Sequence, residues 1–205
     1  LSTNRPFILF LSRIHPKKGL DLLLNALNKF SDHVRPQTSV CYIRPKATLL
    51  PVSTLPEHIS NVHFYESPSH LDKLRSSCNI FVSTSKYEPF GLSILEALAA
   101  GMCVVIPKDG AYWDEILEEG VNCAKYNPDD PLDLYYTLQA LSLDMSHAKE
   151  LALAGRDIAD SYCAEITYRP LVDSIVNSVE SEKAAKKSGF NIAYADESRP
   201  SRKEV

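Results

Sequence analysis

The sequence lacks long hydrophobic runs, and no apolar stretch approaches the roughly 18 to 20 residues that a membrane-spanning helix needs. It also lacks an excess of positive charge, because 22 lysines and arginines face 26 aspartates and glutamates, giving a net charge of −4. Such a chain has no general field that attracts nucleic acid or an anionic membrane. These absences exclude a spanning helix and argue against nucleic acid as a partner.

Metal-ligand and hydrolase patterns are missing as well. The five cysteines are an odd number and never form a C-x-x-C pair, and the six histidines show no metal-ligand spacing. No G-x-S-x-G elbow is present, so hydrolase chemistry has no support. We predict no metal site. Four of the five cysteines have β-branched or aromatic neighbours, which favours buried thiols in a reducing, cytoplasmic compartment.

The chain is long enough for one large domain, since 44% of its 205 residues are hydrophobic. It has neither an initiating methionine nor a signal-peptide pattern, and a strand-like segment begins at Phe7. We interpret it as the downstream part of a longer protein, with an N-terminal domain absent from this chain. That absent domain would hold half of an active site.

Short apolar runs alternate with segments of helical period, which is typical of βα units and a mainly parallel sheet. The sequence therefore predicts an α/β fold. Asp130 followed by Pro131 is typical of a helix start, and Gly101 of a helix end. The expected strands are 7–11, 39–43, 62–65, 79–83, 103–106 and 122–126, and the expected helices lie near 20–27, 69–77, 91–100, 112–118, 131–143, 146–161 and 167–179.

Two segments differ in composition from the rest. Residues 44–60 carry several prolines and show no clear period. From residue 181 the chain is rich in Lys, Glu, Ser and Ala with no apolar period, so residues 181–205 are expected to form a disordered charged tail. One domain is expected to occupy residues 1–180.

The sharpest local pattern is the segment from Ser85 to Gly101, which follows an expected strand and opens an expected helix. Gly91 stands where that helix begins, so backbone N–H groups without helical partners lie at the carboxyl edge of the sheet. Such N–H groups bind anions. Glu88 lies in the loop, and Glu96 lies within the helix among apolar residues, so it must face solvent, a cation or a polar ligand.

A second pattern is the cationic turn from Ser12 to Gly19, directly after the first strand. It contains Arg13, Lys17 and Lys18. In an open α/β sheet this is where a phosphate-bearing ligand binds, although a solvated basic loop has the same composition. A cationic turn beside a turn with carboxylates and free amides suits a ligand that has both phosphates and hydroxyls.

The frame EPFGLSILEALAAG, from Glu88 to Gly101, and SRIHPKKG, from Ser12 to Gly19, resemble the C-terminal, donor-binding domain of the retaining GT-B glycosyltransferases of family 4. The resemblance covers roughly residues 6–143 and is strongest over residues 83–105. It implies a Rossmann-like sheet flanked by helices, which is one half of a GT-B fold.

The resemblance also implies a role for each matching residue. Arg13 and Lys18 would neutralise the donor diphosphate and stabilise the charge on it as the glycosidic bond breaks. Glu88 would hold hydroxyls of the transferred sugar, and Glu96 the ribose hydroxyls. The donor would also meet the backbone amides of Phe90, Gly91 and Leu92.

The implied reaction transfers a hexose-type sugar with retention from a nucleoside-diphosphate sugar, without a metal or other cofactor. The sugar or lipid-linked acceptor would bind through the absent N-terminal domain, which would also make any peripheral membrane contact. Alone, this chain would bind the donor but barely catalyse. No Asp-x-Asp sequence is present, so the metal-binding motif of the other large glycosyltransferase fold is absent.

Two alternatives stay open, and the first rests on departures of the sequence from the family pattern. Ser12, Glu66 and Ala111 stand where the family usually has glycine, as does the turn from Ile43 to Lys46. Each lost glycine removes a position for close backbone approach to a ligand, and Glu66 near a diphosphate would repel it. A non-catalytic module derived from a glycosyltransferase is the first alternative. A nucleotide-sugar epimerase of the same fold is the second.

Overall fold

The computed structural model describes residues 5–44 and 58–187. The chain divides into two compact units, Leu1–Ser161 and Tyr162–Val205. The first unit is an α/β domain and contains every described strand. This unit ends at Ser161, whereas the sequence led us to expect a domain that extends to residue 180.

The centre of the first unit is a parallel sheet with six strands in its described residues, in the order β3-β2-β1-β4-β5-β6. The strands are β1 (Phe7–Arg13), β2 (Gln37–Ile43), β3 (Val62–Glu66), β4 (Ile80–Val82), β5 (Cys103–Pro107) and β6 (Ala124–Tyr126). Strand order reverses between β1 and β4, which pair through Ile8 and Ile80. Ligands of open α/β sheets bind at the carboxyl edge at such a switch point.

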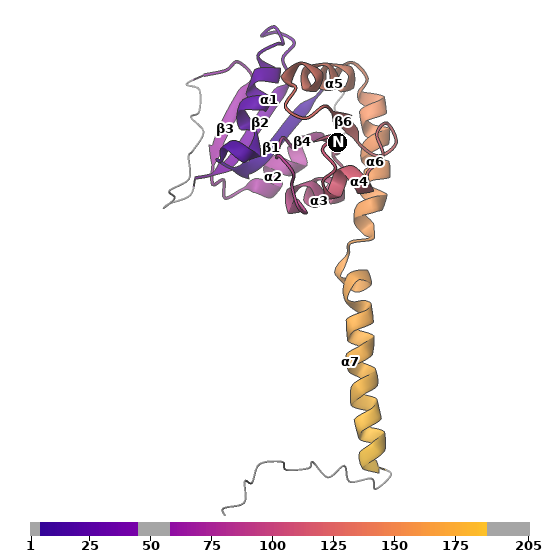
Figure 1. The fold of residues 1–205 in the computed structure, drawn as a ribbon. Coiled ribbons are helices and arrows are strands. Elements are labelled where there is room, and N and C mark those ends of the chain that lie inside the picture. Colours follow the sequence, from indigo (N-terminus) through magenta and orange to yellow (C-terminus); the bar gives the residue numbers. More distant parts are fainter. Residues whose placement is uncertain (1–4, 45–57, 188–205) are drawn as a thin grey trace, which may run out of the picture. The chain divides into compact units, whose positions relative to one another are not determined.

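The helices follow the predicted order and cover both faces of the sheet. They are α1 (Leu20–Leu27), α2 (Leu71–Ser77), α3 (Leu92–Ala99), α4 (Tyr112–Ile116), α5 (Pro131–Leu143) and α6 (Met145–Asp160), with a short 3₁₀ turn, η1 (Pro16–Lys18), before α1. In the view of Figure 1, α1 and α5 lie above the sheet and α2 and α3 below it. α6 packs on α3 and β5. The predicted α/β, Rossmann-like class is confirmed.

The start of α5 shows how the sequence fixes these boundaries. The side chain of Asp130 accepts hydrogen bonds from the backbone N–H groups of Leu132 and Asp133, at 2.8 and 3.1 Å. Pro131 occupies the first helical position, where a missing N–H costs nothing. The predicted helix start is confirmed.

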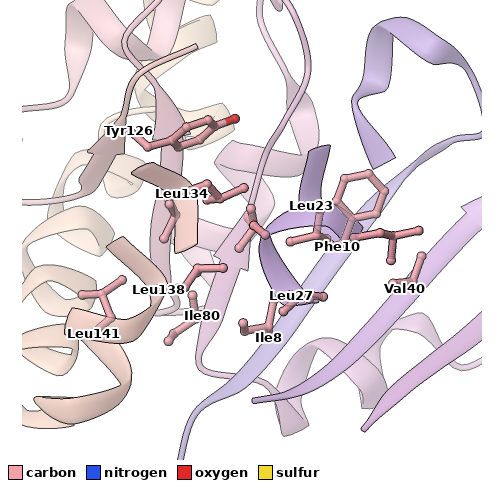
Figure 2. Close-up of a cluster of buried hydrophobic side chains, with 14 of the residues drawn as sticks. Ile8, Phe10, Leu23, Leu27, Val40, Ile80, Tyr126, Leu134, Leu138 and Leu141 are labelled. Carbon is pink, nitrogen blue, oxygen red and sulfur yellow. The ribbon is translucent and has the colours of Figure 1, made fainter. Parts of the chain in front are cut away.

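The main core lies between the sheet and the pair α1 and α5. Leu23 and Leu27 of α1 and Leu138 of α5 pack over the side chains of Ile8 and Phe10 from β1, and each of these five is at most 2% exposed (Figure 2). The leucines whose spacing predicted α1 therefore form the face that this helix buries. This packing holds β1 and β4 in the middle of the domain, so the loops that leave their carboxyl ends start from fixed points.

The second unit contains α7 (Ala164–Lys187), which corrects one expectation. We expected a helix over residues 167–179 and disorder from residue 181, yet α7 continues through Lys187. Residues 181–187 are Ser, Glu, Lys and Ala, and three of these four types are strong helix formers even without an apolar face. The expectation of disorder is therefore wrong for residues 181–187, and residues 188–205 lie outside the described part of the chain.

Candidate functional site

The loop after β1 and the loop after β4 are bonded to one another at the switch point. The hydroxyl oxygen of Thr84 lies 2.8 Å from the carbonyl oxygens of both Lys18 and Gly19. The backbone N–H of Lys86 donates to the carbonyl of Lys17 at 2.9 Å. The cationic turn and the carboxylate segment of the sequence are therefore neighbours in space.

Gly19 is the point of closest approach between these loops. Its φ is +67°, in the left-handed region that favours glycine. A Cβ atom added there would lie 2.2 Å from the carbonyl oxygen of Thr84. No side chain fits between the loops at this position.

Lys18 and Glu88 form an ion pair across the gap between the two loops. Their side chains are 24% and 22% exposed, so both are partly shielded from water yet still open to a ligand. Both were predicted as donor-binding residues, and the structure brings them together. The negative charge of Glu88 is therefore balanced by Lys18, the cation to which the resemblance assigns a role in binding phosphate.

Arg13 is the last residue of β1 and is exposed. It makes no ion pair with any residue in the described ranges 5–44 and 58–187. The hydroxyl of Ser12 donates to the carbonyl of Arg13 at 2.9 Å, so Ser12 satisfies its own side chain locally. Arg13 thus lies at the carboxyl edge of the sheet, as predicted, with its side chain exposed.

Helix α3 begins beside this pair. Gly91 is its N-cap with φ of +71°, and no side chain caps the helix start. A Cβ at Gly91 would lie 2.9 Å from Cγ of Glu88, so glycine lets the helix start approach that carboxylate. Leu92, the first helical residue, is 66% exposed. The predicted anion-binding helix start and Glu88 are thus adjacent.

Phe90, in the loop that precedes α3, packs against two aromatic rings. Its ring centroid lies 5.0 Å from that of Tyr112 and 5.7 Å from that of Trp113. Trp113 is 2% exposed, so α4 anchors this part of the loop in the core. The side chain of Phe90 serves packing, while its backbone lies in the segment that leads to α3.

Glu96 occupies a different place from the Lys18 and Glu88 pair. Its carboxylate accepts a hydrogen bond from Arg75 of α2 at 2.7 Å, and Arg75 also donates to Asp72 at 2.6 Å. The sequence left solvent, a cation or a polar ligand as possible neighbours of Glu96. The structure pairs Glu96 with the cation Arg75, and its side chain is still 50% exposed. Sequence analysis missed Arg75, because helical spacing does not show which residue of α2 faces α3.

Glu66, one of the departures from the family pattern, carries its own charge partners. It ends β3, where its carboxylate accepts from the hydroxyl of Tyr42 at 3.2 Å and lies 3.5 Å from Nε of Arg44. Burial and the hydrogen bond to Glu66 raise the pKa of the Tyr42 hydroxyl. The negative charge of Glu66 is thus partly neutralised. Residues 45 and 46, the rest of that turn, lie outside the described residues.

The loop after β4, which carries Glu88, is called the carboxylate loop here. A pocket of about 190 Å³ borders this loop on the side of α1 and β6. A second, much smaller cavity of about 10 Å³ lies next to Glu88 and Trp113. Asp109, in the loop after β5, lines both cavities.

Among residues 5–44 and 58–187 no group of three or more Asp, Glu, His or Cys side chains is arranged to hold a metal ion. In the same residues no helix has the length and hydrophobicity needed to cross a membrane.

A family comparison covers most of the first unit. The model of the family described as "Glycosyl transferases group 1" matches residues 1–157. The chain belongs to this family. Both the cationic turn and the Glu88 to Gly101 segment lie within the matched residues. The α/β unit is accordingly the Rossmann-like half of a GT-B fold that the sequence pattern indicated.

Curated relatives match most of this chain but are much longer. An alpha-maltose-1-phosphate synthase of Mycolicibacterium smegmatis is 28% identical over 169 residues, covering 75% of this chain and 43% of its own length. Sulfoquinovosyl transferase SQD2 of Arabidopsis thaliana is 27% identical over 165 residues, covering 78% of this chain and 31% of its own length. The chain thus spans less than half the length of these two relatives.

Solved structures of other proteins share the fold. Anabaena Alr3699/HepE in complex with UDP-glucose matches with a TM-score of 0.66 at 22% identity, over 85% of this chain and 49% of that one. The C-terminal domain of LpcC, a group 1 family protein of Francisella tularensis, matches with a TM-score of 0.61 at 22% identity. That match covers 76% of this chain and 85% of the LpcC domain.

Proposed function

We propose that this chain is the donor-binding half of a retaining glycosyltransferase, which binds a nucleoside-diphosphate sugar for hexosyl transfer to a glycan or lipid-linked acceptor. The observation that carries the proposal is the Lys18–Glu88 pair beside the start of α3, at the switch point where Arg13 ends β1. Two cations, one carboxylate and a helix start suit a ligand with a diphosphate and sugar hydroxyls.

Each group has a separate task in this proposal. Arg13 and Lys18 bind the diphosphate, together with backbone amides of Phe90, Gly91 and Leu92. As the glycosidic bond breaks, negative charge grows on the departing diphosphate, and fixed cations and amides stabilise it. Glu88 accepts hydrogen bonds from the transferred sugar, and Glu96 from the ribose.

Lys18 must exchange partners when the donor binds. Its ammonium group is paired with Glu88, so a diphosphate competes with that carboxylate. The exchange also releases Glu88, whose oxygens become available to sugar hydroxyls. One ion pair would thus couple recognition of the diphosphate to recognition of the sugar.

The acceptor site belongs to the N-terminal domain that we infer for the complete protein. The donor half alone is then expected to bind nucleotide sugar and to turn it over very slowly. UDP-glucose is the first donor to test, because it is bound in the Anabaena protein of the same fold.

Calorimetric titration with UDP, GDP and ADP, and with their glucose conjugates, tests this function. We expect one nucleotide to bind, and its sugar conjugate to bind more tightly. Binding of none of these ligands by the folded chain would overturn the proposal and favour the non-catalytic module. Conversion of a nucleotide sugar to its epimer without any acceptor would favour the epimerase.

A further inference from the structure

The backbone of Tyr87 lies in the left-handed region, with φ of +52°. Residues with a Cβ atom rarely adopt this conformation, which persists only where the surroundings impose it. Tyr87 is 70% exposed, so packing of its side chain does not impose this conformation. The constraint must come from the backbone and from the residues bonded to it.

Asp109 supplies that constraint from a neighbouring loop. Its Oδ2 accepts a hydrogen bond from the backbone N–H of Tyr87 at 2.9 Å. Its Oδ1 accepts from the backbone N–H of Ala111 at 3.0 Å, which fixes the carboxylate on the loop after β5. One carboxylate therefore ties the loop after β4 to the loop after β5.

Three consecutive residues of the carboxylate loop are held by three different partners. The N–H of Lys86 donates to Lys17, the N–H of Tyr87 donates to Asp109, and the side chain of Glu88 pairs with Lys18. The first and third contacts both lead to the loop after β1. The contact with Asp109 comes from the opposite side, from the loop after β5. It therefore constrains the direction of the backbone at Glu88, the next residue.

We propose that Asp109 is a positioning residue, which holds Tyr87 in its left-handed conformation and so aims Glu88 at the transferred sugar. This inference rests on the proposed function for the role of Glu88. Asp109 touches neither donor nor acceptor in this scheme. It acts through the backbone, and its loss affects sugar recognition more than nucleotide recognition.

Binding of UDP and UDP-glucose to wild type, Asp109→Ala and Asp109→Asn tests the proposal. In wild type we expect UDP-glucose to bind more tightly than UDP. Asp109→Ala should reduce that ratio at least fivefold while the affinity for UDP stays within twofold. Asp109→Asn keeps an acceptor oxygen for the N–H of Tyr87 and should retain most of the ratio. Asp129→Asn is the charge control, because Asp129 borders the same pocket and pairs with the exposed Lys86.

Amide hydrogen exchange provides a readout that does not depend on any ligand. Without its acceptor, the amide of Tyr87 should exchange at least tenfold faster in Asp109→Ala, with unchanged exchange in the strands. Unchanged exchange at Tyr87, or an unchanged UDP-glucose to UDP ratio, would overturn the role of Asp109. If wild type shows no preference for UDP-glucose over UDP, the sugar-binding role of Glu88 fails instead, and the exchange rate alone decides whether Asp109 holds the loop.

Discussion

The ammonium group of Lys18 pairs with the carboxylate of Glu88, which lies 70 residues further along the chain. The pair joins the two loops that flank the switch point of the sheet. In the proposed function it places the charge that would bind phosphate and the charge that would bind sugar in direct contact. Any ligand that engages one of these side chains therefore changes the electrostatic environment of the other.

Nucleotide binding should weaken as salt concentration rises, because Arg13 is exposed and its attraction for a diphosphate is screened. Arg13→Ala should lower affinity and flatten the salt dependence. Lys18→Ala should do both and also leave Glu88 without its cation. Calorimetry at low and high salt measures both effects. Lys29→Ala, which removes an exposed charge near the far end of α1, should change neither, and a wild-type affinity that is independent of salt would argue against the phosphate assignment.

Ribose recognition should depend on Glu96. A carboxylate on a helix can accept from two adjacent hydroxyls, and each hydrogen bond to a charged group contributes roughly 1.5 to 3 kcal/mol. A 2′-deoxynucleotide should therefore bind about tenfold to a hundredfold more weakly than its ribose counterpart. Glu96→Gln should remove most of this preference, while Glu88→Gln should leave it intact.

The control for the ribose test is stability, because Glu96 also accepts a hydrogen bond from Arg75. Melting temperatures without ligand show whether Glu96→Gln unfolds the domain. Glu150→Gln, an exposed change of the same kind on α6, should keep the ribose preference. Equal binding of ribose and deoxyribose nucleotides by folded wild type would contradict the role of Glu96.

Gly19→Ala should destabilise the domain more than Gly120→Ala. Both glycines have positive φ, of +67° and +73°, so both substitutions carry a left-handed backbone cost of roughly 1–2 kcal/mol. Only Gly19 adds a steric clash, since its Cβ would lie 2.2 Å from Thr84 while a Cβ at Gly120 would meet nothing within 4 Å. Urea denaturation of the two variants measures the difference. Equal losses of stability would mean that the loops separate easily.

Four of the five thiols should be unreactive in the native protein. Cys41, Cys78, Cys103 and Cys123 are buried, whereas Cys163 is partly exposed. Burial raises the pKa of Cys41 to about 11 and the pKa values of Cys103 and Cys123 to about 12. A thiol reagent at neutral pH should label one site quickly, and Cys163→Ser should abolish that phase.

The same thiols give stability a dependence on alkaline pH. Their folded pKa values lie above the ordinary value of 9.0, so the folded state disfavours the thiolate. The stabilisation is complete below pH 9 and is lost as pH rises toward 11 and 12. Denaturation midpoints across this range should fall, and Cys103→Ala should reduce the fall.

The sequence predicted most of the fold because its signals are local. The leucine spacing of α1 and the Asp130 to Pro131 start of α5 each depend on neighbouring residues alone. The convergence of the two loops also followed, since parallel strands bring their carboxyl ends to one edge. The helix past residue 180 was missed because its strong helix formers lack the apolar period on which the prediction relied.

What could not be predicted depends on contacts between distant elements. The pairing of Glu96 with Arg75 requires knowing how α3 packs against α2. The left-handed conformation of Tyr87 has no sequence signal, because tyrosine is not a residue that favours it. Its cause is a carboxylate 22 residues away, on another loop.

The pairing of β1 with β4 also bears on how the domain folds. The two loops of the candidate site meet only after the chain has closed a loop of about 70 residues, as the separation of Lys18 and Glu88 shows. Long-range parallel pairing of this kind forms slowly compared with local helices. In refolding, recovery of nucleotide binding should therefore lag behind recovery of helical circular dichroism, which makes ligand binding a reporter of completed chain topology.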